Sequence, residues 1–176
     1  KTFGRMPPGG RPEPRGGRPR SRGGIVTRAK KELEQLHLLL GVPAFPERHA
    51  QRYPLFVLNA LLGGTMSSRL FQKVREERGL AYSVYSAVNA FKDAGVMMVY
   101  AGTSPDKGDE LLSVVRDELC DLRDKGPSAR EVEVAKEHLK GSLMLSLEST
   151  SSRMSNLAWQ EMYHGRTFSM EEVLER

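Results

Sequence analysis

Apolar residues change their spacing along the chain, from strand-like runs near its start to helical stripes further on. Residues 33–40 are mostly apolar and are followed by Gly41 and Pro43, which predicts a strand that ends there. His37 lies within this run, and we interpret it as a packed or hydrogen-bonded core histidine in preference to a metal ligand. Between 49 and 62 the apolar residues recur at helical spacing, which predicts a helix with one stripe against a sheet.

Residues 61–86 combine a glycine turn, a short amphipathic helix and a strand, and we expect the fold to be organised around them. The pair Gly63-Gly64 predicts a flexible turn, after which Ser67 or Ser68 can cap the helix. Gly79 stands where a left-handed residue would end this helix, and strand-forming residues follow it. We expect one helix face to carry Leu70, Phe71 and Val74, and the opposite face to carry Lys73, Arg75, Glu76 and Arg78.

A β-hairpin is predicted next. Residues 80–91 and 96–101 are strand-like, and the turn over 92–95 joins them. The second run is more continuously apolar, so we expect it to be a central strand. The order of strand, helix, short helix, two strands and then helices predicts an α+β fold, with an antiparallel sheet backed by helices.

Capping signals introduce the helices of the second half of the chain. Ser104 with Pro105 begins one helix, and the pair Gly126-Pro127 ends it. Ser128 and Glu131 have capping-box spacing for a long helix. The remaining signals are a break at 149–152, a helix over 154–163 closed by Gly165, and a capping box at Ser169 and Glu172.

Length and composition predict one domain preceded by a basic arm. The 176 residues suffice for one buried core, and no window approaches the roughly 20 apolar residues that cross a bilayer, so we expect no membrane contact. Residues 1–24 are rich in Gly, Pro and Arg and predict a flexible linker. We assign residues 25–176 to the domain and expect it to continue past Arg176, where a helix has barely begun. Because Lys1 replaces an initial methionine, we expect a fragment or a trimmed product.

The formal net charge of +5 is concentrated in the first 30 residues. They hold nine Lys or Arg and one acid, Glu13, whereas the remainder is slightly acidic. The domain therefore offers no broad basic field for phosphates, which argues against nucleic acid as a partner. The Arg-Gly-Gly segments at 15–17 and 22–24 leave one alternative open, an RNA-associated protein that binds through its arginine arm.

The running sequence resembles the zinc metallopeptidases of the pitrilysin and insulinase type, closest to the branch of the mitochondrial processing peptidase and its bacterial relatives. Two segments carry the resemblance: MSSRLFQKVREERGLAYSVYS at residues 66–86, after the glycine pair, and ELEQLHLLLG at residues 32–41. It covers the chain from about Arg28 onward. It implies the C-terminal half of a protein built from two halves of related fold, in which the N-terminal half holds zinc.

No residues of this chain form a recognisable catalytic or metal motif. Such a peptidase uses His-x-x-Glu-His, and the nearest segment here, residues 134–138, has Val134 in the first histidine position. We therefore expect zinc only in the absent N-terminal half. Cys120 is the single cysteine, which excludes a disulfide framework, and we interpret it as a small core residue. Nucleophile-elbow, P-loop and dinucleotide motifs are also absent from the sequence.

The resemblance implies substrate-binding roles for Arg75 and Tyr82, which would hydrogen-bond the bound peptide and its scissile carbonyl. From the residues alone, the alternative is an Arg75 paired with Glu32 or Glu76 and a Tyr82 packed in the sheet. The strand that contains Tyr82 can also lend backbone groups to an extended peptide.

The resemblance also links Gly63 and Gly64 to a glycine-rich loop that handles substrate in the non-catalytic subunit of the processing peptidase. Thr65 stands where that loop has a third glycine, so we expect a stiffer loop here.

We therefore expect the substrate-binding C-terminal domain of a zinc metalloendopeptidase, inactive alone and closing a chamber over its peptide substrate. Its partner would be the N-terminal catalytic half or a homologous subunit, and the full-length protein would form a dimer. The alternative is a non-catalytic partner or scaffold subunit of a processing-peptidase-like heterodimer. We expect the bacterial cytoplasm as its location, with the mitochondrial matrix as the alternative.

Overall fold

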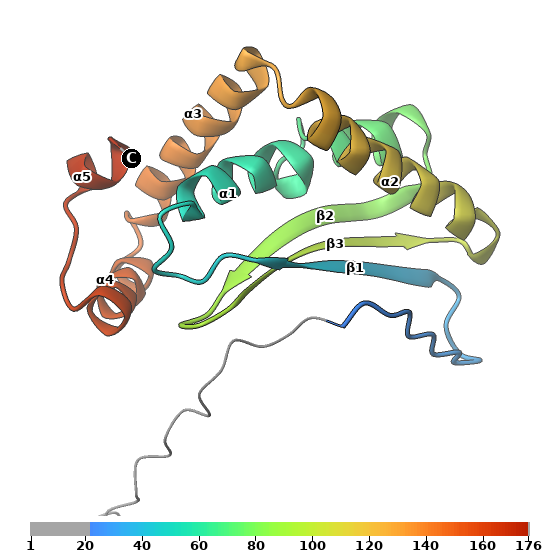
Figure 1. Ribbon diagram of the computed structural model, residues 1–176, viewed down its shortest axis with the longest axis horizontal. Helices are drawn as coiled ribbons and strands as arrows, with labels where there is room; N and C mark the ends of the chain where they lie inside the picture. Colours follow the sequence, from blue (N-terminus) through green and yellow to red (C-terminus); the bar gives the residue numbers. More distant parts are fainter. Residues whose placement is uncertain (1–21, 176) are drawn as a thin grey trace, which may run out of the picture.

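The computed structural model describes residues 22–175, so the predicted linker over residues 1–24 lies almost entirely outside the described part. An antiparallel three-stranded sheet with strand order β1-β3-β2 forms its centre (Figure 1). The predicted α+β fold is confirmed, and so is the hairpin with its second strand in the middle. The strands are β1 (Leu36–Ala44), β2 (Ala81–Ala90) and β3 (Gly95–Thr103).

Strand β1 extends further than its sequence pattern predicts. It begins at Leu36 and continues through Gly41 and Pro43 to Ala44, which pairs with Gly95. The prediction that the strand ends at Gly41 was wrong. Because β1 lies at an edge of the described sheet and pairs only with β3, a proline without an N–H is tolerated there.

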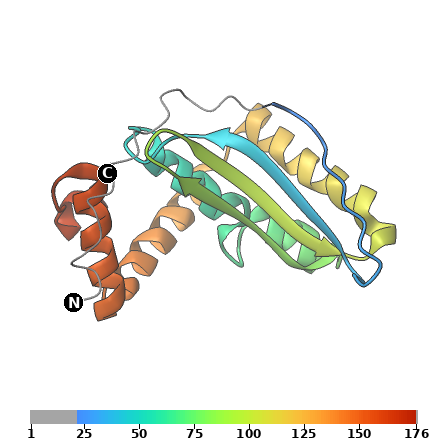
Figure 2. The same ribbon diagram turned by 90° about the horizontal axis from the view of Figure 1, so that it is seen from below.

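Helices cover one face of the sheet, and within the described residues no helix covers the other face (Figures 1 and 2). Leu62, Leu70, Val74, Leu111 and Val115 are almost fully buried and pack against inward residues of the sheet such as Val99. The covering segments are α1 (Arg52–Asn59), η2 (Ala60–Gly64), η3 (Phe71–Glu77) and α2 (Gly108–Lys125), the last preceded by the short turn η4 (Pro105–Lys107).

The capping residues of the last helices lie largely where the sequence predicts them. The hydroxyl of Ser128 accepts from the Glu131 backbone N–H, and the Glu131 carboxylate accepts from the Ser128 N–H, which completes the capping box. Ser149 caps the next helix, which begins at Thr150 and not at 154 as predicted, because a serine hydroxyl satisfies its first turn. The helices are α3 (Ala129–Ser146), α4 (Thr150–His164) and α5 (Met170–Leu174), and Gly165 closes α4 in a left-handed conformation.

Helix α4 projects from the body and is attached through a buried arginine. None of its residues is buried, but His164 Nε2 lies 2.7 Å from Arg52 Nη1. Arg52 also donates to the Glu47 backbone oxygen at 2.8 Å and to the Tyr53 hydroxyl at 2.7 Å. An arginine can only donate, so His164 accepts here in its neutral form.

This contact predicts that stability depends on pH through His164. Burial, together with the charge of Arg52, lowers the pKa of His164 below its ordinary value. In the unfolded chain the imidazole titrates near 6.5, so below that pH the unfolded state binds more protons and folding is disfavoured. The free energy of unfolding in urea should therefore fall between about pH 7.5 and about pH 5.5, and fall less in His164→Gln. An equal fall in both proteins would contradict the assignment.

Candidate functional site

Arg75 and Tyr82, which the sequence analysis singled out, lie in contact on the surface of the domain. The guanidinium carbon of Arg75 lies 4.5 Å from the centre of the Tyr82 ring and 4.7 Å from that of Phe71. The cation is therefore in contact with two aromatic rings, one from η3 and one from β2. We call these three residues the aromatic clamp.

A β-bulge places Tyr82 in this position. Ala81 pairs with Thr103 and Ser83 with Gly102, so Tyr82 has no partner on β3. Ala81 and Val84 are buried, whereas Tyr82 and Ser83 both face outward, as an extra residue in a strand allows. Tyr82 is 79% exposed, so its predicted alternative of packing in the sheet is wrong.

The reversal between η3 and β2 depends on Gly79. Its φ of 56° lies in the left-handed region, and the Leu80 N–H returns to the Val74 carbonyl at 2.8 Å. Strand β2 thus begins directly beside η3, which brings Tyr82 next to Arg75. The predicted end of the helix at Gly79 is confirmed.

The clamp leaves hydrogen-bond donors available. Rings stack on the flat faces of a guanidinium, while its N–H groups lie in the plane and point outward. Of the pairings considered for Arg75, the one with Glu76 is present, with Nε to Oε1 at 3.5 Å on an exposed surface where ion pairs are weak. Arg75 and the exposed Tyr82 hydroxyl can therefore both donate to a peptide carbonyl.

The glycine pair is part of a packed helix and not of a flexible turn, so that prediction was wrong. Gly63 and Gly64 end η2, and Gly63 is buried against β2. A Cβ at Gly63 would lie 2.5 Å from the Ser86 backbone nitrogen. The Ser86 hydroxyl donates to the Asn59 carbonyl at 3.1 Å across the same contact. Close approach of helix and strand thus accounts for Gly63, and a role for either glycine in substrate binding stays a prediction.

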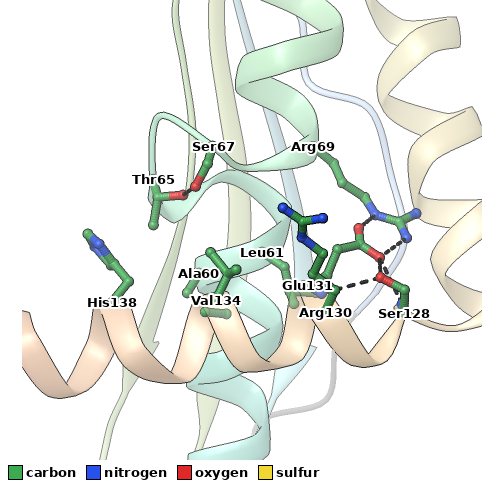
Figure 3. A pocket seen from close by; sticks show the side chains of 11 residues that line it. Ala60, Leu61, Thr65, Ser67, Arg69, Ser128, Arg130, Glu131, Val134 and His138 are labelled. Atoms are coloured by element: carbon green, nitrogen blue, oxygen red, sulfur yellow. Dashed lines mark hydrogen bonds and ion pairs between the residues drawn. The ribbon is translucent and has the colours of Figure 1, made fainter.

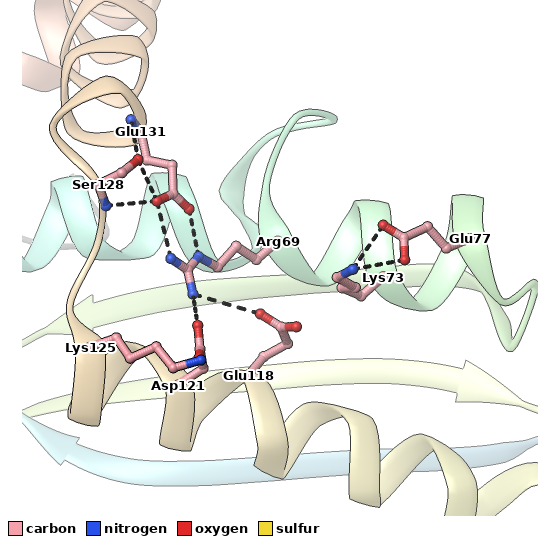
Figure 4. A network of polar contacts seen from close by, with 8 residues as sticks. All are labelled: Arg69, Lys73, Glu77, Glu118, Asp121, Lys125, Ser128 and Glu131. Carbon is pink, nitrogen blue, oxygen red and sulfur yellow. Dashed lines mark hydrogen bonds and ion pairs between the residues drawn. The ribbon is translucent and has the colours of Figure 1, made fainter.

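The start of η3 is held by an ion network that the sequence analysis missed (Figure 4). Arg69 Nε lies 2.6 Å from Glu131 Oε1, and its Nη1 lies 2.8 Å from Asp121 Oδ2 and 3.8 Å from Glu118 Oε2. The hydrogen bond from Arg69 lowers the pKa of Glu131 to about 2. The predicted serine cap is absent, since Ser68 donates its hydroxyl to the Thr65 carbonyl.

Val134 and His138, from the segment that is nearest to the His-x-x-Glu-His motif, line a small cavity and do not form a metal site. A cavity of about 250 Å³ lies between the turn after η2 and helix α3, where both Val134 and His138 face it (Figure 3). His138 Nε2 is 3.3 Å from the Ser142 hydroxyl. Among residues 22–175, no group of three His, Cys, Asp or Glu side chains is arranged to hold a metal ion. The described residues therefore do not fit zinc.

The structure also shows the positions of His37 and Cys120, which the sequence analysis discussed. His37 is exposed on the uncovered face of the sheet, where its Nδ1 lies 2.8 Å from the Tyr100 hydroxyl. It is hydrogen-bonded as predicted, but the prediction of a core position was wrong because its side of β1 has no covering helix. Cys120 is a half-buried free thiol in α2.

A larger hollow of about 680 Å³ lies between α1, α3 and α5 and is mostly apolar. Lys136 and Lys140 are its only charged lining residues among those described. We call it the apolar groove. Unlike the aromatic clamp, its walls offer mainly aliphatic and aromatic contacts.

In the described part of the chain, no helix is long and apolar enough to cross a membrane.

The sequence profile of the peptidase M16 inactive domain matches residues 1–139. The chain belongs to this family. The resemblance to zinc metallopeptidases is thereby confirmed, while the processing-peptidase branch stays a prediction.

Among curated relatives of this M16 inactive domain are proteins named as zinc proteases. The uncharacterized zinc protease YmxG of Bacillus subtilis is 46% identical over 145 residues, which are 82% of this chain and 36% of that protein. The uncharacterized zinc protease SCO5738 of Streptomyces coelicolor is 41% identical over 153 residues, which are 87% of this chain and 33% of that protein. The chain thus spans about a third of the length of these relatives.

Solved structures share the fold of the M16 inactive domain. A conserved protein from Enterococcus faecalis has a TM-score of 0.69 and 26% identity, covering 81% of this chain and 33% of that one. A peptidase M16 inactive domain from Pseudomonas fluorescens has a TM-score of 0.63 and 24% identity, covering 80% of this chain and 37% of that one. The second of these similarities shows the fold alone.

The close contact at Gly63 predicts that even one methyl group destabilises the domain. Gly63→Ala would push the added carbon against the β2 backbone, and such overpacking costs about 1–3 kcal/mol. Gly41→Ala is the matched control, since its added carbon meets Val96 Cγ2 at an ordinary 3.8 Å. Thermal unfolding should show a clearly lower midpoint for Gly63→Ala only. Equal midpoints for the two variants would refute the packing explanation.

Proposed function

We propose that this chain is the substrate-binding C-terminal domain of a zinc-dependent metalloendopeptidase and that it does not cleave peptides alone. The observation that carries the proposal is the aromatic clamp, in which the Arg75 guanidinium and the exposed Tyr82 phenol lie together at the start of β2. The inactive-domain profile and the relatives named zinc proteases support the same class of protein.

The clamp would act on the carbonyl group of the scissile bond. When water attacks a peptide bond, negative charge develops on the carbonyl oxygen. A fixed cation and a phenol donor near that oxygen stabilise charge that appears mainly in the transition state. Arg75 would contribute its in-plane N–H groups, and Tyr82 its hydroxyl.

Strand β2 would hold the peptide in register with the clamp. Within the described sheet, β2 pairs only with β3, so its other edge presents backbone groups to an extended chain. Tyr82 lies at the beginning of this edge. A peptide added along β2 would therefore pass beside the clamp, with main-chain hydrogen bonds that do not depend on its sequence.

The zinc and its activated water would come from another part of the enzyme. The described residues do not fit zinc, and the match to this chain covers only about a third of the length of the relatives named zinc proteases. We propose that a catalytic N-terminal half, or a homologous subunit, closes a chamber with this domain, and that the full-length protein is a dimer. The bacterial sources of these relatives support a bacterial enzyme, and we propose the cytoplasm as its compartment.

The proposal predicts that Arg75 and Tyr82, the two hydrogen-bond donors of the clamp, are both needed for cleavage. This chain, mixed with a zinc-loaded N-terminal half of the Bacillus subtilis relative, should cleave a basic presequence-like peptide. Arg75→Ala and Tyr82→Phe should each lower kcat/KM by about 100-fold, the scale of losing one transition-state donor. Two controls should leave kcat/KM close to wild type. Lys73→Ala removes a cation of η3 that pairs with Glu77, and Tyr85→Phe removes the hydroxyl of another exposed tyrosine of β2.

Restored cleavage that is equal in the wild type, Arg75→Ala and Tyr82→Phe would overturn the proposal. It would favour the second candidate, a scaffold subunit that contributes only its fold.

A further inference from the structure

We propose that Phe71 is a positioning residue, whose ring holds the Arg75 guanidinium against Tyr82 so that the N–H groups of Arg75 point toward the bound peptide. This inference rests on the proposed function and deepens it. It concerns a residue that touches neither the peptide nor the zinc in the proposal and acts only through Arg75.

The geometry places Phe71 on the same side of η3 as Arg75. The two residues are four positions apart, and the Arg75 guanidinium carbon lies 4.7 Å from the Phe71 ring centre. The expectation that they occupy opposite helix faces was wrong, because residues four apart are neighbours on a helix surface. The cation therefore contacts one ring of its own helix and one of the following strand.

Phe71 is not needed to anchor η3. Leu70 and Val74 are fully buried and attach the helix to the core, whereas Phe71 is only half-buried and lies outside the main core cluster. Arg69 fixes the start of the same segment through its carboxylate partners. The ring of Phe71 is therefore not required to hold η3 in place, and its contact with Arg75 can serve to orient the guanidinium.

Without the Phe71 ring, Arg75 would keep only the contact with the exposed Tyr82 ring and a weak ion pair. Among residues 22–175, Arg75 has a single ion pair, with Glu76 at 3.5 Å, and Glu76 is itself exposed. The other charged residues of this face are engaged elsewhere, Lys73 with Glu77 at 2.8 Å and Arg78 with Glu110 at 3.5 Å. An arginine has a large rotamer entropy, so pre-orienting its planar group favours each hydrogen bond that it later forms.

The test compares Phe71→Leu, which removes the ring but keeps an apolar side chain, with Phe71→Tyr, which keeps the ring. Phe71→Met is a second apolar variant in case the leucine variant melts early. The first readout is the NMR resonance of the Arg75 Nε–H group in this chain alone, assigned by its loss in Arg75→Lys. Ring currents of Phe71 and Tyr82 should displace this resonance, and the leucine and methionine variants should move it toward the exposed arginines. Phe71→Tyr should leave it in place.

The second readout is cleavage by the assembly with the catalytic half. Phe71→Leu should lower kcat/KM by about 3- to 10-fold, the range expected for releasing one rotamer-rich side chain. Phe71→Tyr should restore it, and thermal unfolding of the variants should stay close to wild type. A purely structural role would instead lower the melting temperature and would not distinguish the aromatic variant.

The outcomes separate this inference from the proposed function. An unmoved Arg75 resonance in Phe71→Leu would overturn the positioning role whatever the cleavage rate. The role would also be overturned if the resonance moves and cleavage is unchanged while Arg75→Ala still loses about 100-fold. Unchanged cleavage in Arg75→Ala itself would show that the proposed function has failed, and the positioning role with it.

Discussion

The charge network of Arg69 is the interaction on which the placement of the clamp depends. One guanidinium binds Glu131 at the start of α3 and Asp121 of α2, so three helical segments meet at a single side chain. Charge-assisted hydrogen bonds of this kind are stronger than neutral ones, and the planar guanidinium fixes direction as well as distance. Arg69 leads directly into η3, which carries Phe71 and Arg75. The orientation of the clamp on the sheet is therefore set at the network.

The clamp combines a firmly packed helical segment, η3, with an exposed tyrosine. Leu70 and Val74 are buried and attach η3 to the core, while the bulge turns Tyr82 outward so that its ring contacts Arg75. A site built on such firmly packed elements can hold its donors in place before a substrate arrives. Helix α4 is the opposite case, since none of its residues is buried and its contact with Arg52 requires a neutral His164. We expect local opening to begin there and not at the clamp.

The parts of the fold that follow from local patterns were predicted from the sequence, and the parts that depend on distant contacts were not. Gly79, Ser128 and Gly165 act within a few residues of themselves, so their roles could be inferred from spacing. The partners of Arg69 lie 52 and 62 residues away along the chain, and His164 lies 112 residues from Arg52. No local pattern encodes such pairs.

The site shows the same division. The resemblance pointed to Arg75 and Tyr82, and the structure brings them into contact, but nothing in the sequence showed the bulge that aims Tyr82 or the ring contact from Phe71. Gly63 was misread as flexible because a buried glycine at a helix–strand contact and a glycine in a loop look alike in sequence. In each case the deciding neighbour comes from another element of the fold.

The central claim, that peptides bind along β2 beside the clamp, is tested most directly by photo-crosslinking. A cleavage-resistant peptide with a benzoylphenylalanine next to the scissile position would be bound to the assembly of this chain with its catalytic half. Mass spectrometry would then locate the crosslinked residues. The account predicts crosslinks on this chain within residues 71–86. Crosslinks confined to the apolar groove between α1 and α3, or to the catalytic half, would contradict it.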